Sequence, residues 1–231
     1  MFSGIRVELF AYTASFRVPG FVGHQLTLQV PPISTIYGLL SAAAGRRIKP
    51  EDVSWFAYVC QSEAVASDLE AITAFERGKE QEIASPKTRN IIQREFLAFP
   101  RLFLYLPLEW RTVFYCPHYS LLLGRTQDVA TVEVIKEIKL EPVTEGEVKG
   151  VLFPREVIFQ GSRIHCIVYN LPIAFTEDPN RRPLGVELFG IVTKSTKVRI
   201  PGWLVQDTDN GFVMPIYRRE WIQSVIQRAI S

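Results

Sequence analysis

Hydrophobic and polar positions alternate at the start of the chain. Apolar residues occupy every second position from Ile5 to Ala11, with Arg6, Glu8 and an aromatic residue between them. A period of two is that of a β-strand. The pattern predicts a first strand whose second face is half aromatic.

The segment PPISTIYGLLSAAAG, residues 31–45, has helical spacing instead. Ile36, Leu39, Leu40 and Ala43 recur on one face, and Gly45 follows at the position of a carboxyl-terminal cap. The spacing predicts a helix of about three turns.

The start of this helix carries candidate chemistry. Ser34 and Thr35 follow two prolines at expected capping positions, where free N–H groups and hydroxyls can bind an anion such as phosphate. Gly38 costs a helix about 1 kcal/mol relative to alanine. That cost indicates a close neighbour, either a ligand or the protein's own sheet.

Further elements follow along the chain. Residues 53–75 favour two strands, although their Ala-rich second half also fits a helix. Charged residues from 76 onward predict a long hairpin that projects from the body, and residues 100–108 predict another strand. Short strands follow from Val132, and residues 218–230 predict a closing amphipathic helix.

This order predicts an α+β protein. We expect an amino-terminal domain, residues 1–131, for which a ferredoxin-like arrangement is the leading candidate. Residues 132–231 form a β-rich carboxyl-terminal part that ends in a helix. The 231 residues are 47% hydrophobic, which is enough for a core.

Composition indicates in which cellular compartment the protein lies and which metal and cysteine chemistry it lacks. The amino terminus lacks the unbroken apolar run of a signal peptide, so we expect a cytoplasmic protein without membrane association. Three widely separated cysteines predict buried thiols rather than a disulfide framework or a zinc site. No cofactor is expected.

Charge is unevenly distributed on a chain of formal net charge +2. Acidic residues gather in 132–150, whereas basic residues gather in 46–49, 85–96 and 193–201, and in the pairs Arg181/Arg182 and Arg218/Arg219. This distribution permits a basic face, although charge alone favours the alternative of solvated loop and strand edges.

Signals for catalysis are weak. His24, His118 and His165 are the candidate general bases, and none lies in a recognisable motif. One catalytic function stays as an alternative to a purely binding role. It is metal-free RNA cleavage, in which Tyr37 acts together with His118 or His24. No metal-ligand spacing, phosphate-binding loop or nucleophile elbow is present.

The segment LLLGRTQDVATV, residues 121–132, carries a second polar group. Gly124 permits close backbone approach, and Arg125 and Gln127 suit contacts with phosphate or base edges. The alternative is a polar turn held by an Arg125–Asp128 pair. The segment by itself leaves both interpretations open.

Four segments together carry a family likeness. YTASFRVPG, PPISTIYGLLSAAAG, QREFL and LLLGRTQDVATV, in this order and spacing, resemble CRISPR-associated protein family five. The likeness spans nearly the first 135 residues. It implies a ferredoxin-like (RRM-like) RNA-binding domain, a protruding thumb hairpin at about residues 76–95, and a smaller β-rich carboxyl-terminal part.

The resemblance also implies a function and a set of contacts. Members of this family hold the 5′ handle of the guide RNA (crRNA) in type I Cascade complexes, next to a backbone subunit and the large subunit that recognises target DNA near the protospacer-adjacent motif. One branch, in type I-C systems, cleaves precursor RNA with a tyrosine and a Lys-His pair. This chain has Pro117-His118 instead, which favours a non-cleaving, type I-B/I-D-like branch. The RNA-binding residues carried over are Arg17, Ser34, Thr35, Tyr37, Lys87, Arg89, Arg94, Gly124, Arg125, Gln127 and Asp128.

Overall fold

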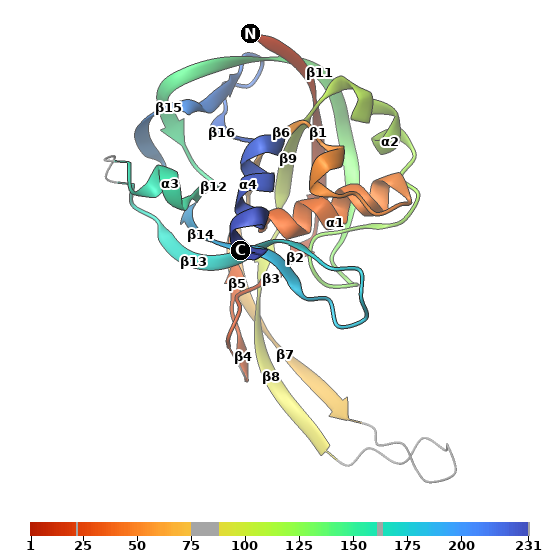
Figure 1. Ribbon diagram of the computed structural model, residues 1–231. Coiled ribbons are helices and arrows are strands. Elements are labelled where there is room, and N and C mark those ends of the chain that lie inside the picture. Colours follow the sequence, from red (N-terminus) through yellow and green to blue (C-terminus); the bar gives the residue numbers. More distant parts are fainter. Residues whose placement is uncertain (22, 75–87, 161–163, 231) are drawn as a thin grey trace.

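The computed structural model describes residues 1–21, 23–74, 88–160 and 164–230. These residues form four sheets, of which the largest has seven strands, together with short and long helices (Figure 1). The predicted α+β class is confirmed. Within the described residues, no helix combines the length and the apolar character needed to cross a membrane.

The seven-stranded sheet closes on itself. Its order is β1-β9-β6-β16-β15-β11-β10, and β1 also pairs with β11. Strand β11 closes the ring because its first half pairs with β1 and its second half with β15, as its arch in Figure 1 shows. The strands are β1 (Phe2–Ala11), β6 (Trp55–Gln61), β9 (Arg101–Leu106), β10 (Leu121–Leu122), β11 (Val129–Val148), β15 (Thr196–Asp207) and β16 (Val213–Arg218).

Two helices connect strands of this sheet. Helix α1 (Ile33–Ala44) lies in the chain between β1 and β6, and α2 (Arg111–Tyr115), preceded by the short helix η2 (Leu108–Trp110), lies between β9 and β11. Within this sheet the strands β11, β1, β9 and β6 lie side by side in that order, and each pairs with the next in antiparallel orientation. The expected domain division after residue 131 falls inside β11, which pairs with strands from both halves of the chain.

Helix α1 confirms the predicted segment but corrects its start. Gly45 has a φ of 67°, the left-handed conformation expected of a glycine that ends a helix. The N-cap is Pro32, with no side-chain capping hydrogen bond. Ser34 and Thr35 were expected to cap the helix, yet they lie inside its first turn because the helix begins at Ile33.

Hydrophobic periodicity explains how α1 packs. Its apolar face and alternate residues of β1 enter one core cluster, together with apolar residues of α4 (Arg219–Ile230). A second cluster lies on the other side of the sheet, against β12 (Val151–Pro154) and α3 (Arg155–Ile158). Helix α4 matches the helix predicted at the end of the chain.

A long hairpin projects from the body (Figure 1). Its arms are β7 (Ala64–Ala74) and β8 (Thr88–Ala98), so the Ala-rich segment is a strand and the helical alternative was wrong. The short strands β2 (Thr13–Ala14) and β4 (His24–Gln25) flank the base of β8, and β3 (Phe16–Arg17) pairs with β5 (Thr27–Leu28). The hairpin is longer than the expected range 76–95, and residues 76–87 of that range lie outside the described part of the chain.

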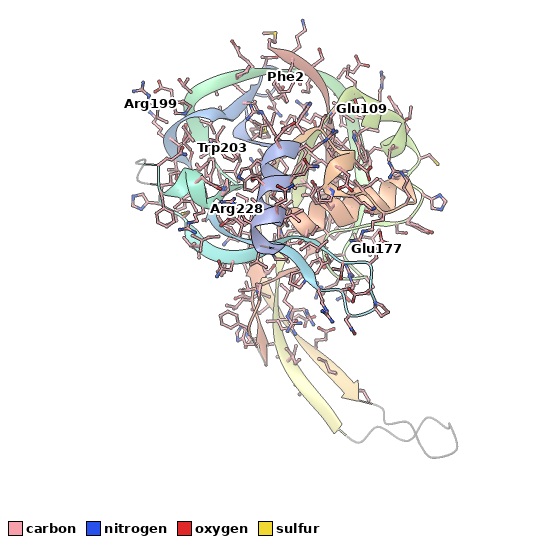
Figure 2. All side chains as sticks on the ribbon, viewed as in Figure 1. Phe2, Glu109, Glu177, Arg199, Trp203 and Arg228 are labelled. Atoms are coloured by element: carbon pink, nitrogen blue, oxygen red, sulfur yellow. The ribbon has the colours of Figure 1, made fainter. Side chains whose placement is uncertain are left out.

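The carboxyl-terminal part returns to α1. Strand β14 (Pro183–Val192) pairs with β12 on one side and β13 (Ile167–Phe175) on the other. The turn between β13 and β14 extends along α1, where Glu177 marks it in Figure 2. The short helix η1 (Pro50–Asp52) leads from α1 toward β6. This arrangement gives α1 a neighbour more than 100 residues away in the sequence.

Candidate functional site

Two adjoining cavities, of about 310 and 340 Å³, follow the same side of α1. Both are lined by Ser34, Gly38, Phe175 and Arg181, so they form one groove, which we call the α1 groove. Its floor includes Gly38, which is exposed and whose hypothetical Cβ would come within 4 Å of no described atom outside the neighbouring backbone of α1. The sequence left two explanations for Gly38, a bound ligand or the protein's own sheet packed against it. The sheet does not lie close to Gly38, so the second explanation is excluded.

The two polar segments of the sequence meet at one end of this groove. Ser34 and Thr35 from α1 line the same cavity as Gly124 from the loop after β10. Gly124 has a φ of 117°, and a Cβ there would lie 2.0 Å from the carbonyl oxygen of Ser15. Its close approach is thus to the protein's own backbone, and the fold itself requires this glycine.

Arg125 and Asp128 hold the loop that follows Gly124. The Asp128 carboxylate is fully buried and accepts hydrogen bonds from Thr13 Oγ1 at 2.6 Å and from Arg125 Nε and Nη2 at 3.0 and 2.9 Å. Arg125 also lies over the Phe96 ring. Burial alone raises the pKa of Asp128, but these hydrogen bonds outweigh it, and the pKa lies below its ordinary value.

This geometry corrects the prediction for Asp128. A carboxylate with no exposed surface does not contact RNA, and the interpretation as a polar turn with an Arg-Asp pair is the one the structure supports. The guanidinium of Arg125 is committed to the same pair, with its side chain only 15% exposed. Gln127, in contrast, is exposed at the surface of the loop.

Tyr37 lines one of the two cavities of the α1 groove, but almost none of its side chain is exposed. Its side chain is 4% exposed and its ring meets Phe56 edge to face at 5.7 Å. Burial is the main reason why its pKa is raised, and its hydroxyl has no hydrogen-bond partner among the described residues. The expected direct contact of Tyr37 with RNA does not fit this burial.

The arginines of the hairpin region lie apart from the α1 groove. Arg94 forms an ion pair with Glu70 across the hairpin and is 15% exposed, so it does not offer the free phosphate contact expected of it. Arg89 lies on β8 opposite Thr73. Arg17 is exposed on β3, and Lys87 lies outside the described residues.

The histidines do not gather with Tyr37. The backbone N–H of His118 donates to the Ala43 carbonyl, and its ring packs against Gly45 at the end of α1. At a rise of 1.5 Å per residue, Tyr37 and Gly45 are about 12 Å apart along the helix axis. His24 lies on β4, beside β8. The geometry therefore assembles none of the tyrosine–histidine pairs considered for RNA cleavage.

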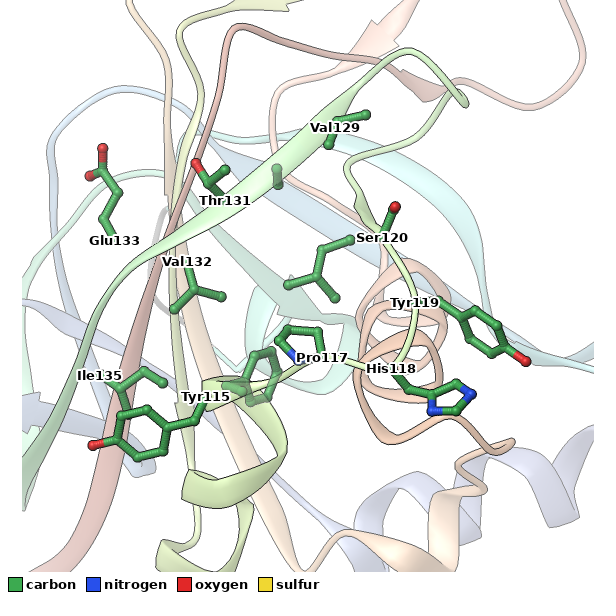
Figure 3. Close-up of a pocket in the computed structure, with 13 residues that line it drawn as sticks. Tyr115, Pro117, His118, Tyr119, Ser120, Val129, Thr131, Val132, Glu133 and Ile135 are labelled. Carbon is green, nitrogen blue, oxygen red and sulfur yellow. The ribbon is translucent and has the colours of Figure 1, made fainter.

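A second, wider cavity of about 690 Å³ lies between the α2–β10 connection and β11. Figure 3 shows Tyr115 toward one end of this trough and His118 and Tyr119 toward the other. Its lining is mainly apolar and aromatic, with Glu133 as its one described carboxylate. Among the residues that the structure describes, no group of three or more His, Cys, Asp or Glu side chains is placed to hold a metal ion.

The structure adds residues to the groove that the sequence did not single out. Arg181 stacks on Phe175, with 5.4 Å between its Cζ atom and the ring centroid. Arg47 donates a hydrogen bond to the Phe175 carbonyl and forms an ion pair with Glu177 at 3.3 Å. The Arg181/Arg182 pair was visible in the sequence, but nothing in it indicated that the β13–β14 turn returns to α1.

Comparisons with known proteins show which solved structures share the fold of this chain. No family model and no curated protein matches the chain. A chain from a solved structure described as a CRISPR RNA-guided surveillance complex has a TM-score of 0.56 and 18% identity over 86% of this chain and 91% of that one. A chain from the type III-B Cmr-beta complex bound to cognate target RNA and AMPPnP has a TM-score of 0.55 and 10% identity over 98% of this chain and 90% of that one. The protein thus shares its fold with chains of CRISPR effector complexes.

Proposed function

We propose that this chain is a non-catalytic, RNA-binding subunit of a type I CRISPR Cascade complex that binds and caps the 5′ handle of the guide RNA. The observation that carries the proposal is the shared fold along nearly the whole chain with chains of RNA-guided CRISPR complexes. The meeting of Ser34, Thr35 and Gly124 at the α1 groove supports it, because these residues come from two of the four segments that carry the family resemblance.

Strand order supports an RNA-binding amino-terminal domain. The antiparallel order β11-β1-β9-β6, with α1 after β1 and α2 after β9, supports the expected ferredoxin-like arrangement. RRM domains of this arrangement bind single-stranded RNA on the open face of their sheet, through aromatic side chains. In this chain the second core cluster, with β12 and α3, covers part of that face. We infer that α1 and the loop after β10 take the handle on the helical side of the sheet.

The projecting hairpin supports the expected subunit contacts. Val65, Leu69 and Ile91 on β7 and β8 are exposed, and cross-strand pairing places them on one face. An exposed apolar face on a projecting element suits a protein neighbour. We assign it to the adjacent backbone subunit, with the large subunit and target DNA near the protospacer-adjacent motif as further partners.

Absence of cleavage is part of the proposal. The buried Tyr37 and the distant His118 support a non-cleaving, type I-B/I-D-like branch rather than a metal-independent endoribonuclease. Incubation of precursor repeat RNA with the purified protein in chelator tests this. We expect intact RNA, and a cut that is lost in His118→Ala would establish the nuclease instead.

Binding is tested with labelled single-stranded RNA of the repeat in the source genome. Fluorescence anisotropy compares this RNA with a scrambled RNA of equal length at one salt concentration, because phosphate contacts make affinity strongly salt-dependent. We expect tighter binding of the repeat RNA. Equal affinity for both RNAs would contradict the proposed function.

A further inference from the structure

The β13–β14 turn forms the second wall of the α1 groove. Phe175 and Arg181 line both cavities, opposite Ser34 and Gly38 of α1. Neither belongs to the segments that carry the family resemblance. The groove consequently depends on a part of the chain to which the sequence patterns assigned no function.

Gly38 indicates that something approaches α1 from this groove. Glycine is unfavourable inside a helix, and apart from the adjacent backbone of α1 no described part of the protein comes within 4 Å of the place where its side chain would begin. Packing therefore does not explain the residue. An open, glycine-floored groove is where a ligand backbone can come close to the helix.

The opposite wall is held in a defined conformation. Arg181 has a φ of 42°, which is uncommon for a residue with a side chain. The turn is fixed by hydrogen bonds from the Arg181 N–H to the Asp178 carbonyl and from the Thr176 N–H to the Arg182 carbonyl, at 2.9 and 2.8 Å. Strained backbone that the surroundings hold in place is typical of functional sites.

The charges and aromatic surface of this wall suit a nucleotide. Arg181 is exposed, stacks on the half-buried Phe175, and forms no ion pair with a described carboxylate. Arg47 is paired with Glu177 and anchors the turn to the end of α1. A guanidinium plane supported by an aromatic ring binds phosphate and also stacks with a base.

We propose that the β13–β14 turn completes the RNA site, so that a single-stranded segment of guide RNA lies in the α1 groove between Gly38 and Arg181. This inference rests on the proposed function. The backbone of the RNA passes over Gly38, and Arg181 binds a phosphate or the face of a base. Arg47 positions the turn without itself contacting the RNA.

The test uses two variants in the full chain and the labelled repeat RNA. Gly38→Leu fills the groove from its floor without meeting a protein atom at Cβ. Arg181→Gln removes the charge at an exposed position. We expect each to weaken binding by roughly tenfold at constant salt, the size typical of losing one good nucleic-acid contact.

Matched controls separate the groove from general effects. Ala229→Leu adds a leucine to an exposed position of α4, and Arg182→Gln removes the same charge from the neighbouring residue, which does not line either cavity. We expect both controls to bind like the wild type, and thermal unfolding of all four variants to show that they remain folded. Photocrosslinking of thiouridine-containing RNA should in addition label residues 174–182.

The outcomes distinguish this inference from the function on which it rests. If the wild type prefers repeat RNA but folded Gly38→Leu and Arg181→Gln bind it equally well, the groove does not bind RNA and is left for another ligand, such as a peptide. Equal losses in Arg181→Gln and Arg182→Gln would also overturn the inference, because they would report only the charge of the turn. A wild type without preference for repeat RNA contradicts the proposed function itself.

Discussion

Arg125→Ala tests whether the loop after Gly124 is a structural turn or a binding surface. The Asp128 carboxylate accepts four hydrogen bonds, three of them from Arg125 through its backbone N–H, Nε and Nη2 atoms, at 3.0, 3.0 and 2.9 Å. The substitution removes the two side-chain donors. It leaves a carboxylate with no exposed surface, held only by Thr13 and one backbone N–H.

The magnitude follows from this burial. Removing one partner of a buried ion pair costs about 3–5 kcal/mol, whereas an exposed pair contributes about 0–1 kcal/mol. Because Arg125 is 15% exposed and Asp128 keeps two donors, we expect a loss of about 3 kcal/mol in the free energy of unfolding. That is a large part of the roughly 5–15 kcal/mol that stabilises a typical protein.

Urea unfolding followed by tryptophan fluorescence measures this loss. Thr126→Ala, at an exposed neighbouring position, is the control, and we expect it to change stability by less than about 0.5 kcal/mol. The double variant Arg125→Ala/Asp128→Asn should recover part of the loss because it buries no unpaired charge. If Arg125→Ala unfolds no more easily than Thr126→Ala, the structural interpretation of this pair is wrong.

The same pair predicts a dependence on pH. The pKa of Asp128 lies below its ordinary value of 3.8, so its charged form stabilises the folded state above that pH and this contribution is lost as the pH falls through the lowered pKa. Removing Arg125 removes that stabilisation. The difference in stability between wild type and Arg125→Ala should therefore be largest at neutral pH and shrink on acidification, and a constant difference would refute the assignment.

Three further substitutions test the packing by the same unfolding measurement. Gly38→Ala should stabilise the protein by about 0.5–1 kcal/mol, because a Cβ there meets nothing and alanine favours the helix; a loss of stability would reveal a neighbour that the structure lacks. Gly124→Ala should cost about 3 kcal/mol or more, since its Cβ would lie 2.0 Å from the Ser15 carbonyl oxygen at a φ of 117°, and a change below 1 kcal/mol would contradict that contact. Arg6→Ala should cost about 3–5 kcal/mol, because it leaves the fully buried Asp207 without the guanidinium 2.6 Å away, and a neutral effect would show that the pair is not buried in solution.

Local patterns predicted the elements where one periodicity was clear. The apolar spacing of α1 and α4 and the alternation in β1 left a single interpretation, and these elements are present. The segment of β7 fitted both strand and helix, because its alanines suit either, and pairing with β8 decides for the strand. Such pairing is a contact between distant residues, so no local pattern reveals it.

The candidate site was predictable only in part for the same reason. Ser34, Thr35 and Gly124 belong to local motifs, and the fold brings them together. Asp128 was misassigned because glycine, arginine and aspartate at this spacing suit both a contact surface and an internal turn. Only the burial of the carboxylate beside Thr13 distinguishes the two.

Gly38 and Gly124 show how the fold separates structural from functional residues. A side chain at Gly124 would collide with the backbone of Ser15, so its role in the fold is sufficient to explain the glycine. A Cβ at Gly38 would meet no described atom within 4 Å outside the neighbouring backbone of α1, and the helix would be more stable with alanine there. Stability and RNA affinity should therefore respond in opposite ways at Gly38, where the protein gains stability on substitution and loses affinity. Variants at Gly124 should lose both together, because any loss of affinity there follows from the distorted loop. This contrast would show that RNA contacts α1 directly at Gly38, whereas Gly124 acts through the fold.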